Sequence, residues 1–148
     1  MMDKNYSLLL KQAEALVSGE SDLIANMANI SSLLFNSVND VNWVGFYLYK
    51  DPELVLGPFN GQPACTRIPV GKGVCGTAYS EQKTHLINDV HAFEGHIACD
   101  AASESEVVVP FNQGDFSGVL DVDSPIKGRF GDQEKELFEA IASLISAV

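Results

Sequence analysis

Basic side chains and long apolar runs are scarce in this sequence. Nine basic side chains face twenty acidic ones, which gives a formal net charge of −11. This charge repels phosphate backbones and anionic lipid surfaces, so neither nucleic acid nor a membrane is an expected partner. No uninterrupted apolar run approaches the ~20 residues that span a bilayer, and the first residues lack the apolar core of an export signal. The sequence therefore predicts a cytoplasmic protein.

Cysteine is also scarce, and its number is odd. The three cysteines are Cys65, Cys75 and Cys99, so they cannot all pair within one chain. In a reducing compartment disulfides are mostly transient and serve catalysis or redox sensing, so we interpret these thiols as chemistry. A chain of 148 residues can bury a core without such staples, and one domain over residues 1–148 is predicted.

Apolar periodicity predicts helices at both ends of the chain. Apolar residues recur at helical spacing over 9–16, and a second stripe over 23–34 follows Ser21, which is placed to cap it. A third stripe covers 137–148, with Asp132 placed to cap the helix. Two N-terminal helices and one C-terminal helix are therefore expected.

The middle of the chain is rich in aromatic and β-branched residues and alternates as strands do. A short helix is predicted over 74–81. Helices at both ends of a strand-rich middle indicate an α+β fold, most simply an antiparallel sheet with helices on one side. The irregular stretch 84–105 holds Cys99 and all three histidines, which is typical of a binding loop. The predicted strands are 43–49, 53–56, 64–69, 84–87, 106–111 and 117–123.

Two cofactor signatures are present only in part. Residues 71–76 match G-x-G-x-x-G, but dinucleotide binding needs a parallel βαβ unit, which this chain has too few interior helices to build. We interpret these glycines as a tight strand-to-helix turn. The cysteines are separated by ten residues (65 to 75) and twenty-four (75 to 99), unlike the close ligand pairs of structural zinc sites, although His96 lies near Cys99. No cofactor and no metal are expected.

Cys99 is the thiol placed best for reaction. It lies in the long loop, where other molecules can reach it, and His96 or backbone dipoles there can favour its thiolate. Cys75 lies between Val74 and Gly76, and it fits a small buried apolar residue as well as a redox-active thiol.

Carboxylates alternate with apolar residues along the last predicted strand. Asp121 and Asp123 share one face, about 7 Å apart, while Leu120 and Val122 take the other. Such a face is either a solvated polar stripe or the wall of a pocket. In a pocket, burial and like charge would raise the pKa of one carboxyl group and make it a proton donor. Glu106 opens the neighbouring strand and would complete an acidic cluster.

Trp43 is the only tryptophan in the chain. An indole of this kind usually belongs to a core, but together with Tyr47 it could equally form an apolar wall of a binding pocket. Both interpretations place the two rings on the same strand, at positions 43 and 47.

Six segments of the chain together resemble the GAF-domain free methionine-(R)-sulfoxide reductases, and the resemblance covers most of the chain. It implies a six-stranded antiparallel sheet flanked by N- and C-terminal helices, with a small pocket over one face. All three cysteines are in register with the family. Residues 111–116 depart from it, because members often have a charged turn there. The matching segments are 42–47, 57–59, 68–76, 98–100, 105–110 and 118–125.

The resemblance also implies roles for individual residues. It assigns the nucleophile to Cys99 and leaves Cys65 or Cys75 as the resolving thiol. It places Trp43 and Tyr47 near the methyl end of the substrate. The carboxylates that it places around the polar groups of the substrate are Glu106, Asp121 and Asp123.

The expected chemistry needs only these residue types. The Cys99 thiolate attacks the sulfoxide sulfur, a carboxylic acid gives its proton to the oxygen, and methionine leaves with Cys99 as sulfenic acid. A second thiol condenses with it to a disulfide, which an external dithiol such as thioredoxin reduces. Preference for the R epimer and a homodimer are implied by the resemblance alone. The alternative is a non-enzymatic GAF small-molecule or redox sensor, which binds a ligand without consuming it.

Overall fold

The structure is a computed structural model that describes residues 2–97, 99 and 101–146. The predictions made at 98, 100 and 148 lie outside these residues. The elements, in chain order, are α1 (Lys4–Val17), α2 (Leu23–Ser37), β1 (Trp43–Lys50), β2 (Glu53–Gly61), β3 (Arg67–Ile68), α3 (Gly73–Glu81), β4 (His85–Ile87), the 3₁₀ turn η1 (Val90–Ala92), β5 (Ser105–Gln113), β6 (Phe116–Ser124) and α4 (Asp132–Ser146).

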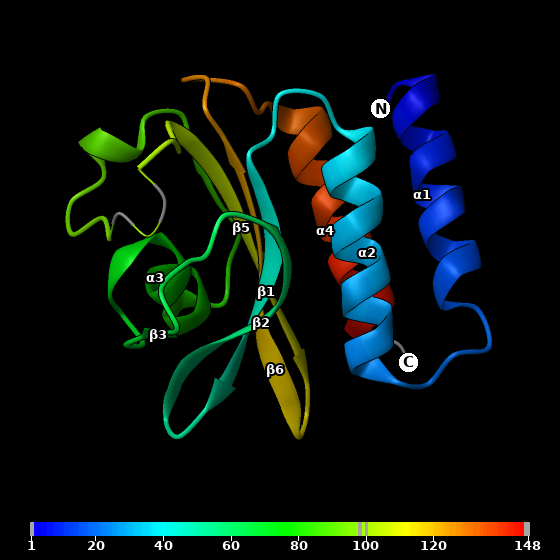
Figure 1. Ribbon diagram of the computed structural model, residues 1–148, viewed down its shortest axis with the longest axis horizontal. Helices are drawn as coiled ribbons and strands as arrows, with labels where there is room; N and C mark the ends of the chain where they lie inside the picture. The colour runs from blue at the N-terminus through cyan, green and yellow to red at the C-terminus, as the bar shows by residue number, and fades with distance from the viewer. Residues whose placement is uncertain (1, 98, 100, 147–148) are drawn as a thin grey trace.

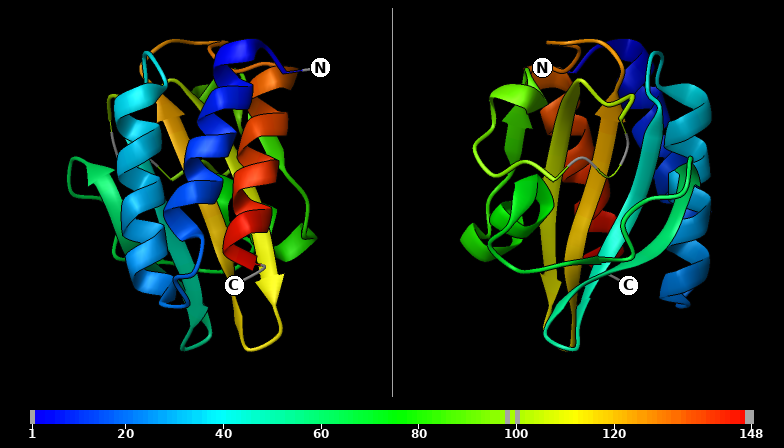
Figure 2. Two further views of the ribbon diagram at one scale, coloured as in Figure 1. Left: turned by 90° about the vertical axis from the view of Figure 1, so that its right-hand side faces the viewer. Right: turned by 60° about the vertical axis from the view of Figure 1, so that its left-hand side comes forward.

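One antiparallel sheet of six strands forms the middle layer, in the order β3-β2-β1-β6-β5-β4. Helices α1, α2 and α4 cover one face, and α3 lies on the other (Figures 1 and 2). The α+β class and the six-stranded antiparallel sheet are confirmed. The expectation of helices on one side alone is wrong, because α3 packs across β5 and β6 on the opposite face.

The alternation of side chains along the central strands builds two cores. Val44 and Phe46 on β1 belong to the core beneath the three long helices, as do Leu120 and Val122 on β6. The intervening residues face α3 instead, where Val74, Cys75 and Ala78 are buried against Trp43, Tyr47, Val108 and Val119. Because strand side chains alternate between faces, every second residue of β1 and β6 points to the α3 side.

The described helices differ in how they begin. Asp3 accepts a hydrogen bond from Tyr6 N, and Asp22 accepts one from Ala25 N. The prediction of Ser21 as a cap is therefore wrong by one residue. Asp132 is the first residue of α4 and not its cap, because Glu134 Oε1 instead accepts from Gly131 N, at 2.7 Å.

Two strands are shorter in the structure than the sequence predicts. The strand expected over 64–69 shrinks to Arg67–Ile68, because the preceding residues leave the sheet to contact β1 side chains. The strand expected over 84–87 begins one residue later, at His85. The hairpin between β5 and β6 turns at 114–115, where Asn112 Oδ1 accepts from Gly114 N.

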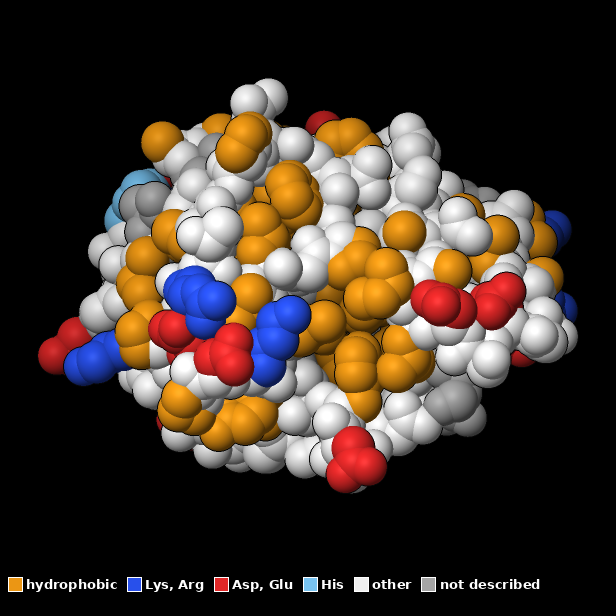
Figure 3. All heavy atoms as spheres, turned by 60° about the horizontal axis from the view of Figure 1, so that its bottom comes forward, with side chains coloured by type: hydrophobic (Ala, Val, Ile, Leu, Met, Phe, Trp, Pro, Cys, Tyr) orange, Lys and Arg blue, Asp and Glu red, His pale blue; other side chains and the backbone are white. Residues whose placement is uncertain are grey.

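The underside of the molecule in the view of Figure 1 carries apolar side chains between scattered charges. On this face the basic side chains are few and lie beside acidic ones (Figure 3). Arg67 forms ion pairs with Asp51 and Glu53. No helix of the described residues combines the length and the apolar character that a membrane span requires.

Candidate active site

The three central strands bring the predicted carboxylates together on the α3 side of the sheet. Glu106 on β5 pairs with Asp123 on β6, and Trp43 on β1 pairs with Asp123 from the other side. Asp121 pairs with Gly45 on β1. Cross-strand neighbours of this kind have Cβ atoms within about 5.5 Å of each other. The sheet register therefore assembles the acidic cluster next to the indole.

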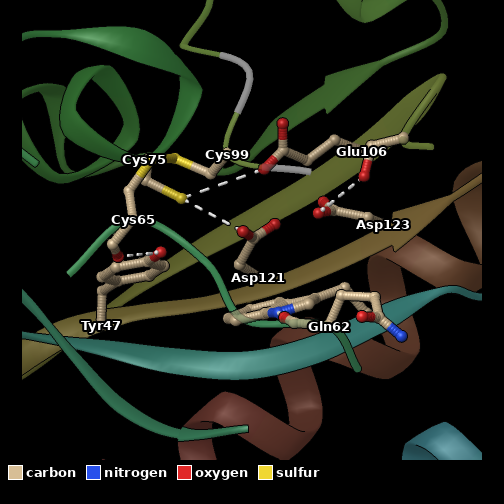
Figure 4. Close-up of a disulfide and its surroundings, with 10 residues drawn as sticks. Tyr47, Gln62, Cys65, Cys75, Cys99, Glu106, Asp121 and Asp123 are labelled. Atoms are coloured by element: carbon tan, nitrogen blue, oxygen red, sulfur yellow. Dashed lines mark hydrogen bonds between the residues drawn. A yellow bond between two sulfur atoms is a disulfide. The ribbon is translucent and has the colours of Figure 1, made fainter. Parts of the chain in front are cut away.

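A disulfide closes over this cluster (Figure 4). It joins Cys65, between β2 and β3, to Cys99, between η1 and β5, with the two Cα atoms 5.1 Å apart. Cys75 on α3 is the free cysteine of the described residues, and it is buried. The structure therefore pairs Cys99 with Cys65, whereas the sequence resemblance leaves Cys65 or Cys75 open as the resolving thiol.

The two aromatic residues of β1 hold the segment that carries Cys65. Trp43 Nε1 donates to Gln62 O at 3.1 Å, and Tyr47 Oη donates to Cys65 O at 2.8 Å. Burial raises the pKa of Tyr47, and the nearby charge of Asp121 raises it further, so the phenol stays a donor. The polar tips of both rings therefore position one of the two disulfide cysteines, while the rings face the pocket.

Gly45 makes room for this aromatic wall. Trp43 stacks on Phe59 with ring centroids 5.2 Å apart, and Gly45 is the residue of β1 directly opposite Phe59. A Cβ atom at Gly45 would meet the Cβ of Phe59 and would lie 2.7 Å from Trp43 Cη2. No side chain fits there unless both rings move.

We expect Gly45→Ala to lower the free energy of unfolding by about 1–3 kcal/mol, the usual cost of overpacking. The indole should also move, which thermal unfolding and tryptophan fluorescence will show. Gly131→Ala is the matched control, because its nearest contact there would be an ordinary 3.5 Å to Glu134 Oε1. Equal stability of the two variants would contradict this account of Gly45.

The carboxylates are buried and only partly hydrogen-bonded. Glu106, Asp121 and Asp123 are 6%, 5% and 7% exposed, so the cluster is not a solvated stripe. Cys75 Sγ lies 3.4 Å from Asp121 Oδ2 and 3.9 Å from Glu106 Oε2. Ser103 Oγ donates to Asp123 Oδ2 at 3.2 Å. In the part of the chain that the structure describes, Asp121 Oδ1 and Asp123 Oδ1 have no hydrogen-bond partner.

Burial shifts the proton affinities of this cluster upward. It raises the pKa of Asp121 well above its ordinary value, and the charge of Asp123 adds to the effect. It raises the pKa of Asp123 in the same way, with Glu106 adding to it. The pKa of Cys75 is also raised by burial and by Glu106. Cys75 is therefore a neutral thiol that donates to carboxylates, and the aspartates can hold a proton for transfer.

These shifts predict a pH-dependent stability cost. A carboxyl group whose pKa is raised on folding binds more protons in the folded state, so the free energy of unfolding falls as pH rises above its ordinary pKa of about 4. We expect Asp121→Asn to raise Tm at pH 8 by roughly 3–6 °C, for a gain of about 1–2 kcal/mol. The gain should vanish near pH 4. Exposed Asp115→Asn is the control, and a gain independent of pH would contradict the assignment.

A small pocket lies between this cluster, α3 and the long loop. The loop forms one wall of the pocket. Its residue Ile97 lies so close to Gly73 that a Cβ atom added at Gly73 would be 3.2 Å from the Ile97 side chain. A neighbouring hollow shares Tyr47, Cys99 and both aspartates and adds Trp43 and Ala64. The pocket itself is lined by Tyr47, Ile68, Gly73, Val74, Cys75, His96, Ile97, Cys99, Ser103, Glu106, Asp121 and Asp123.

Three side chains of the pocket also present donor atoms suited to a cation. One atom each from Cys75, Glu106 and Asp121 lie within 4.8 Å of one another. The expectation that the protein uses no metal comes from the spacing of the cysteines, and it stays a prediction. Apart from His96, the histidines of the chain have acidic partners. His91 Nε2 lies 2.7 Å from Glu104, and His85 Nε2 lies 2.9 Å from Glu81.

Ser103, Ile97 and Gln62 are among the residues of the site that were not predicted from the sequence. Ser103 and Ile97 lie in the irregular stretch before β5, where no periodicity marks a side chain that faces a pocket. Gln62 contributes only its backbone carbonyl to Trp43, and a carbonyl carries no sequence signal. The predicted residues Trp43, Tyr47, Cys65, Cys75, Cys99, Glu106, Asp121 and Asp123 all lie in or beside the pocket.

Comparison with known proteins defines the class of this fold. Residues 25–148 match the family model of the GAF domain. The chain is 50% identical to the free methionine-R-sulfoxide reductase of Escherichia coli over 141 residues, which are 94% of this chain and 86% of the relative.

Solved structures narrow the class further. The Staphylococcus aureus fRMsr in complex with substrate is 52% identical and superposes with a TM-score of 0.91 over 99% of this chain and 97% of that one. The free methionine-R-sulfoxide reductase from Neisseria meningitidis in complex with its substrate is 41% identical, with a TM-score of 0.91 over 99% of this chain and 90% of that one. The chain belongs to the GAF-domain family of free methionine-R-sulfoxide reductases, as the sequence resemblance predicted.

Proposed function

We propose that this protein reduces free methionine-(R)-sulfoxide to methionine, with Cys99 as the nucleophile and Cys65 as the resolving thiol. The observation that carries the proposal is the Cys65–Cys99 disulfide at the wall of a pocket that holds buried, protonatable aspartates. A sulfoxide reductase needs these two devices, a thiol pair that can cycle and an acid that can protonate the sulfoxide oxygen.

The reaction runs in three balanced steps. The Cys99 thiolate attacks the sulfoxide sulfur, the oxygen takes up a proton from the acidic cluster, and methionine leaves with Cys99 as sulfenic acid. The Cys65 thiol then displaces the sulfenic hydroxyl, which forms the disulfide and releases water. An external dithiol reduces the disulfide by exchange and is itself oxidised, so each turnover transfers two electrons from the dithiol to the sulfoxide.

Cys75 fits neither redox role well. Its thiol is buried and is held between Asp121 and Glu106, and its raised pKa disfavours the thiolate that attack requires. We therefore assign Cys75 to the wall of the pocket. This leaves Cys65, whose backbone carbonyl is fixed by Tyr47, as the partner of Cys99.

The remaining side chains divide between the two ends of the substrate. The stacked rings of Trp43 and Tyr47, with centroids 5.9 Å apart, offer an apolar wall for the methyl group. Asp123 accepts a hydrogen bond from Ser103 at the hollow that holds Cys99, whereas Asp121 Oδ2 lies beside the Cys75 thiol, so we assign the proton donor to Asp123. Asp121 and Glu106 lie beside Cys75 and receive the ammonium group of the substrate.

We also propose a physiological reductant and a homodimer. A thioredoxin-like protein is the expected dithiol, in the cytoplasm that the sequence predicts. Exposed apolar side chains on the helical face, Leu8 and Leu16 on α1 and Ile24 on α2, support a homodimer through these helices.

The resolving role of Cys65 makes a specific prediction. With a thioredoxin-like protein as the reductant, wild type is expected to convert free methionine-(R)-sulfoxide over many turnovers, whereas Cys65→Ser should release one methionine per chain and then slow severely. Cys75→Ser should continue to cycle. Methionine release is followed by chromatography, and a sulfenic acid probe should label only Cys65→Ser. Severe arrest of Cys75→Ser with normal cycling of Cys65→Ser would reverse the assignment, and ligand binding without turnover in wild type would indicate a sensor.

A further inference from the structure

The thiol of Cys75 and two buried carboxyl groups form a compact set of donor atoms in the pocket. Cys75 Sγ lies 3.4 Å from Asp121 Oδ2 and 3.9 Å from Glu106 Oε2, and the three atoms lie within 4.8 Å of one another. All three side chains are buried. The proposed reaction uses the carboxyl groups but gives the thiol of Cys75 no chemical task.

The spacing of these donor atoms suits a zinc ion. Zinc binds a thiolate sulfur at about 2.3 Å and a carboxylate oxygen at about 2.0 Å with tetrahedral angles, so its sulfur and oxygen ligands lie about 3.5 Å apart. The two distances from Cys75 Sγ bracket this value. Mg²⁺ and Ca²⁺ suit the set less well, because they prefer larger sets of oxygen ligands without sulfur.

The surroundings of this donor set also favour a cation. Figure 4 shows the carboxyl groups of Glu106, Asp121 and Asp123 gathered at one place, next to the sulfur of Cys75. Asp123 is only 7% exposed, and its Oδ1 has no hydrogen-bond partner in the described part of the chain. Among the described residues, no lysine or arginine lines the pocket. A bound cation would offset the mutual repulsion of these buried carboxylates.

We propose that a thiophilic divalent cation of the Zn²⁺ type binds to Cys75 Sγ, Asp121 Oδ2 and Glu106 Oε2 and inhibits the protein. The thiol releases its proton to solvent when the sulfur binds the ion. The ion takes no part in the reaction. It occupies the carboxyl groups that the proposed function assigns to the substrate, so it excludes the substrate from the pocket. The inhibition therefore rests on the proposed function, whereas the binding of the ion does not.

Cobalt binding to the oxidised protein tests the site without any turnover. Co²⁺ binds to zinc sites, and a thiolate ligand gives it a strong charge-transfer absorption band. With the Cys65–Cys99 disulfide intact, Cys75 is the remaining thiol of the three cysteines, so the band reports on Cys75 alone. We expect one Co²⁺ per chain with this band, and an excess of Zn²⁺ should remove the band. Absence of the band at saturating Co²⁺ would overturn the inference.

Variants separate this site from ions bound at the surface. Cys75→Ser should lose the cobalt band, and Asp121→Asn should weaken Zn²⁺ binding at least about tenfold in titration calorimetry. His91→Gln is the control, because His91 and Glu104 form an exposed pair that could hold an ion by itself. Zn²⁺ binding that Cys75→Ser retains at the wild-type affinity, or that His91→Gln abolishes, would indicate an adventitious ion only and would overturn the inference.

Inhibition is measured in a single turnover, because a dithiol reductant would itself bind Zn²⁺. The fully reduced chain receives one equivalent of free methionine-(R)-sulfoxide, and methionine release is followed with Zn²⁺ or Mg²⁺ present. Zn²⁺ should slow wild type whereas equal Mg²⁺ should not, and Cys75→Ser should need at least about tenfold more Zn²⁺ for the same fractional slowing. Equal sensitivity of the two chains to Zn²⁺ would overturn the inhibition. Failure of wild type to release methionine without added metal would overturn the proposed function and leave the cobalt result standing.

Discussion

Cys99→Ser is expected to lose all measurable turnover of free methionine-(R)-sulfoxide, with dithiothreitol or a thioredoxin-like protein as reductant. A serine hydroxyl cannot attack the sulfoxide sulfur and accept its oxygen, and no other thiol of the described residues is placed to replace it. Cys65 is held by Tyr47 through its carbonyl, and Cys75 is a buried thiol with a raised pKa.

The control for this variant keeps the fold and alters an exposed position. Asp115→Asn lies at the tip of the β5–β6 hairpin and should turn over like wild type. Circular dichroism and Tm should show that Cys99→Ser is folded. Turnover of Cys99→Ser at the wild-type rate would exclude Cys99 as the nucleophile and would move the chemistry to Cys75.

Asp123→Asn is expected to lower kcat by about a hundredfold, with tenfold as the least loss consistent with acid catalysis. Asparagine keeps the size of the side chain and can still contact Ser103, but it cannot give a proton to the sulfoxide oxygen. Glu106→Gln should lose at least about tenfold, because Glu106 pairs with Asp123 across the strands and helps to raise its pKa.

The acid role of the aspartates also predicts the direction in which kcat changes with pH. A general acid must be protonated, so kcat of wild type should fall as pH rises through the raised pKa of the aspartate pair. Asp123→Asn should have a low kcat at every pH and should lack this fall. Full activity of both Asp123→Asn and Glu106→Gln would remove the assignment of the proton donor to this cluster.

The part of the site built from strands could be predicted, because strand alternation is a local property. Asp121 and Asp123 share a face whenever the segment is a strand, and the turn residues near 114 placed Glu106 on the neighbouring strand. The sequence could not decide whether that face was solvated. The decision depends on α3, whose nine residues carry too little pattern to say which side of the sheet they cover.

The partner of Cys99 could not be derived from spacing. Cys65 and Cys99 are 34 residues apart, and they meet only because β2 continues to Gly61 and the following segment folds back to Trp43 and Tyr47. Those bonds end on backbone carbonyls, which any residue provides. Ser103 was missed for a related reason, because a serine in an irregular stretch is ordinary until its partner, Asp123, is known.

The G-x-G-x-x-G motif at residues 71–76 has a simple structural explanation. Gly71 and Gly73 have φ values of +88° and +64°, which L side chains rarely adopt, and they form the turn that leads into α3. The turn was predicted correctly, but its consequence was not. It delivers the start of α3 to the pocket without a side-chain cap.

Peptide mapping of the oxidised protein tests the central claim most directly. The fully reduced chain is treated with one equivalent of free methionine-(R)-sulfoxide without reductant, and its disulfides are identified by mass spectrometry after alkylation and digestion. The account predicts one new disulfide between Cys65 and Cys99, one methionine released per chain, and an alkylated Cys75. A disulfide that joins Cys75 to Cys99, or methionine released while all three cysteines remain reduced, would contradict it.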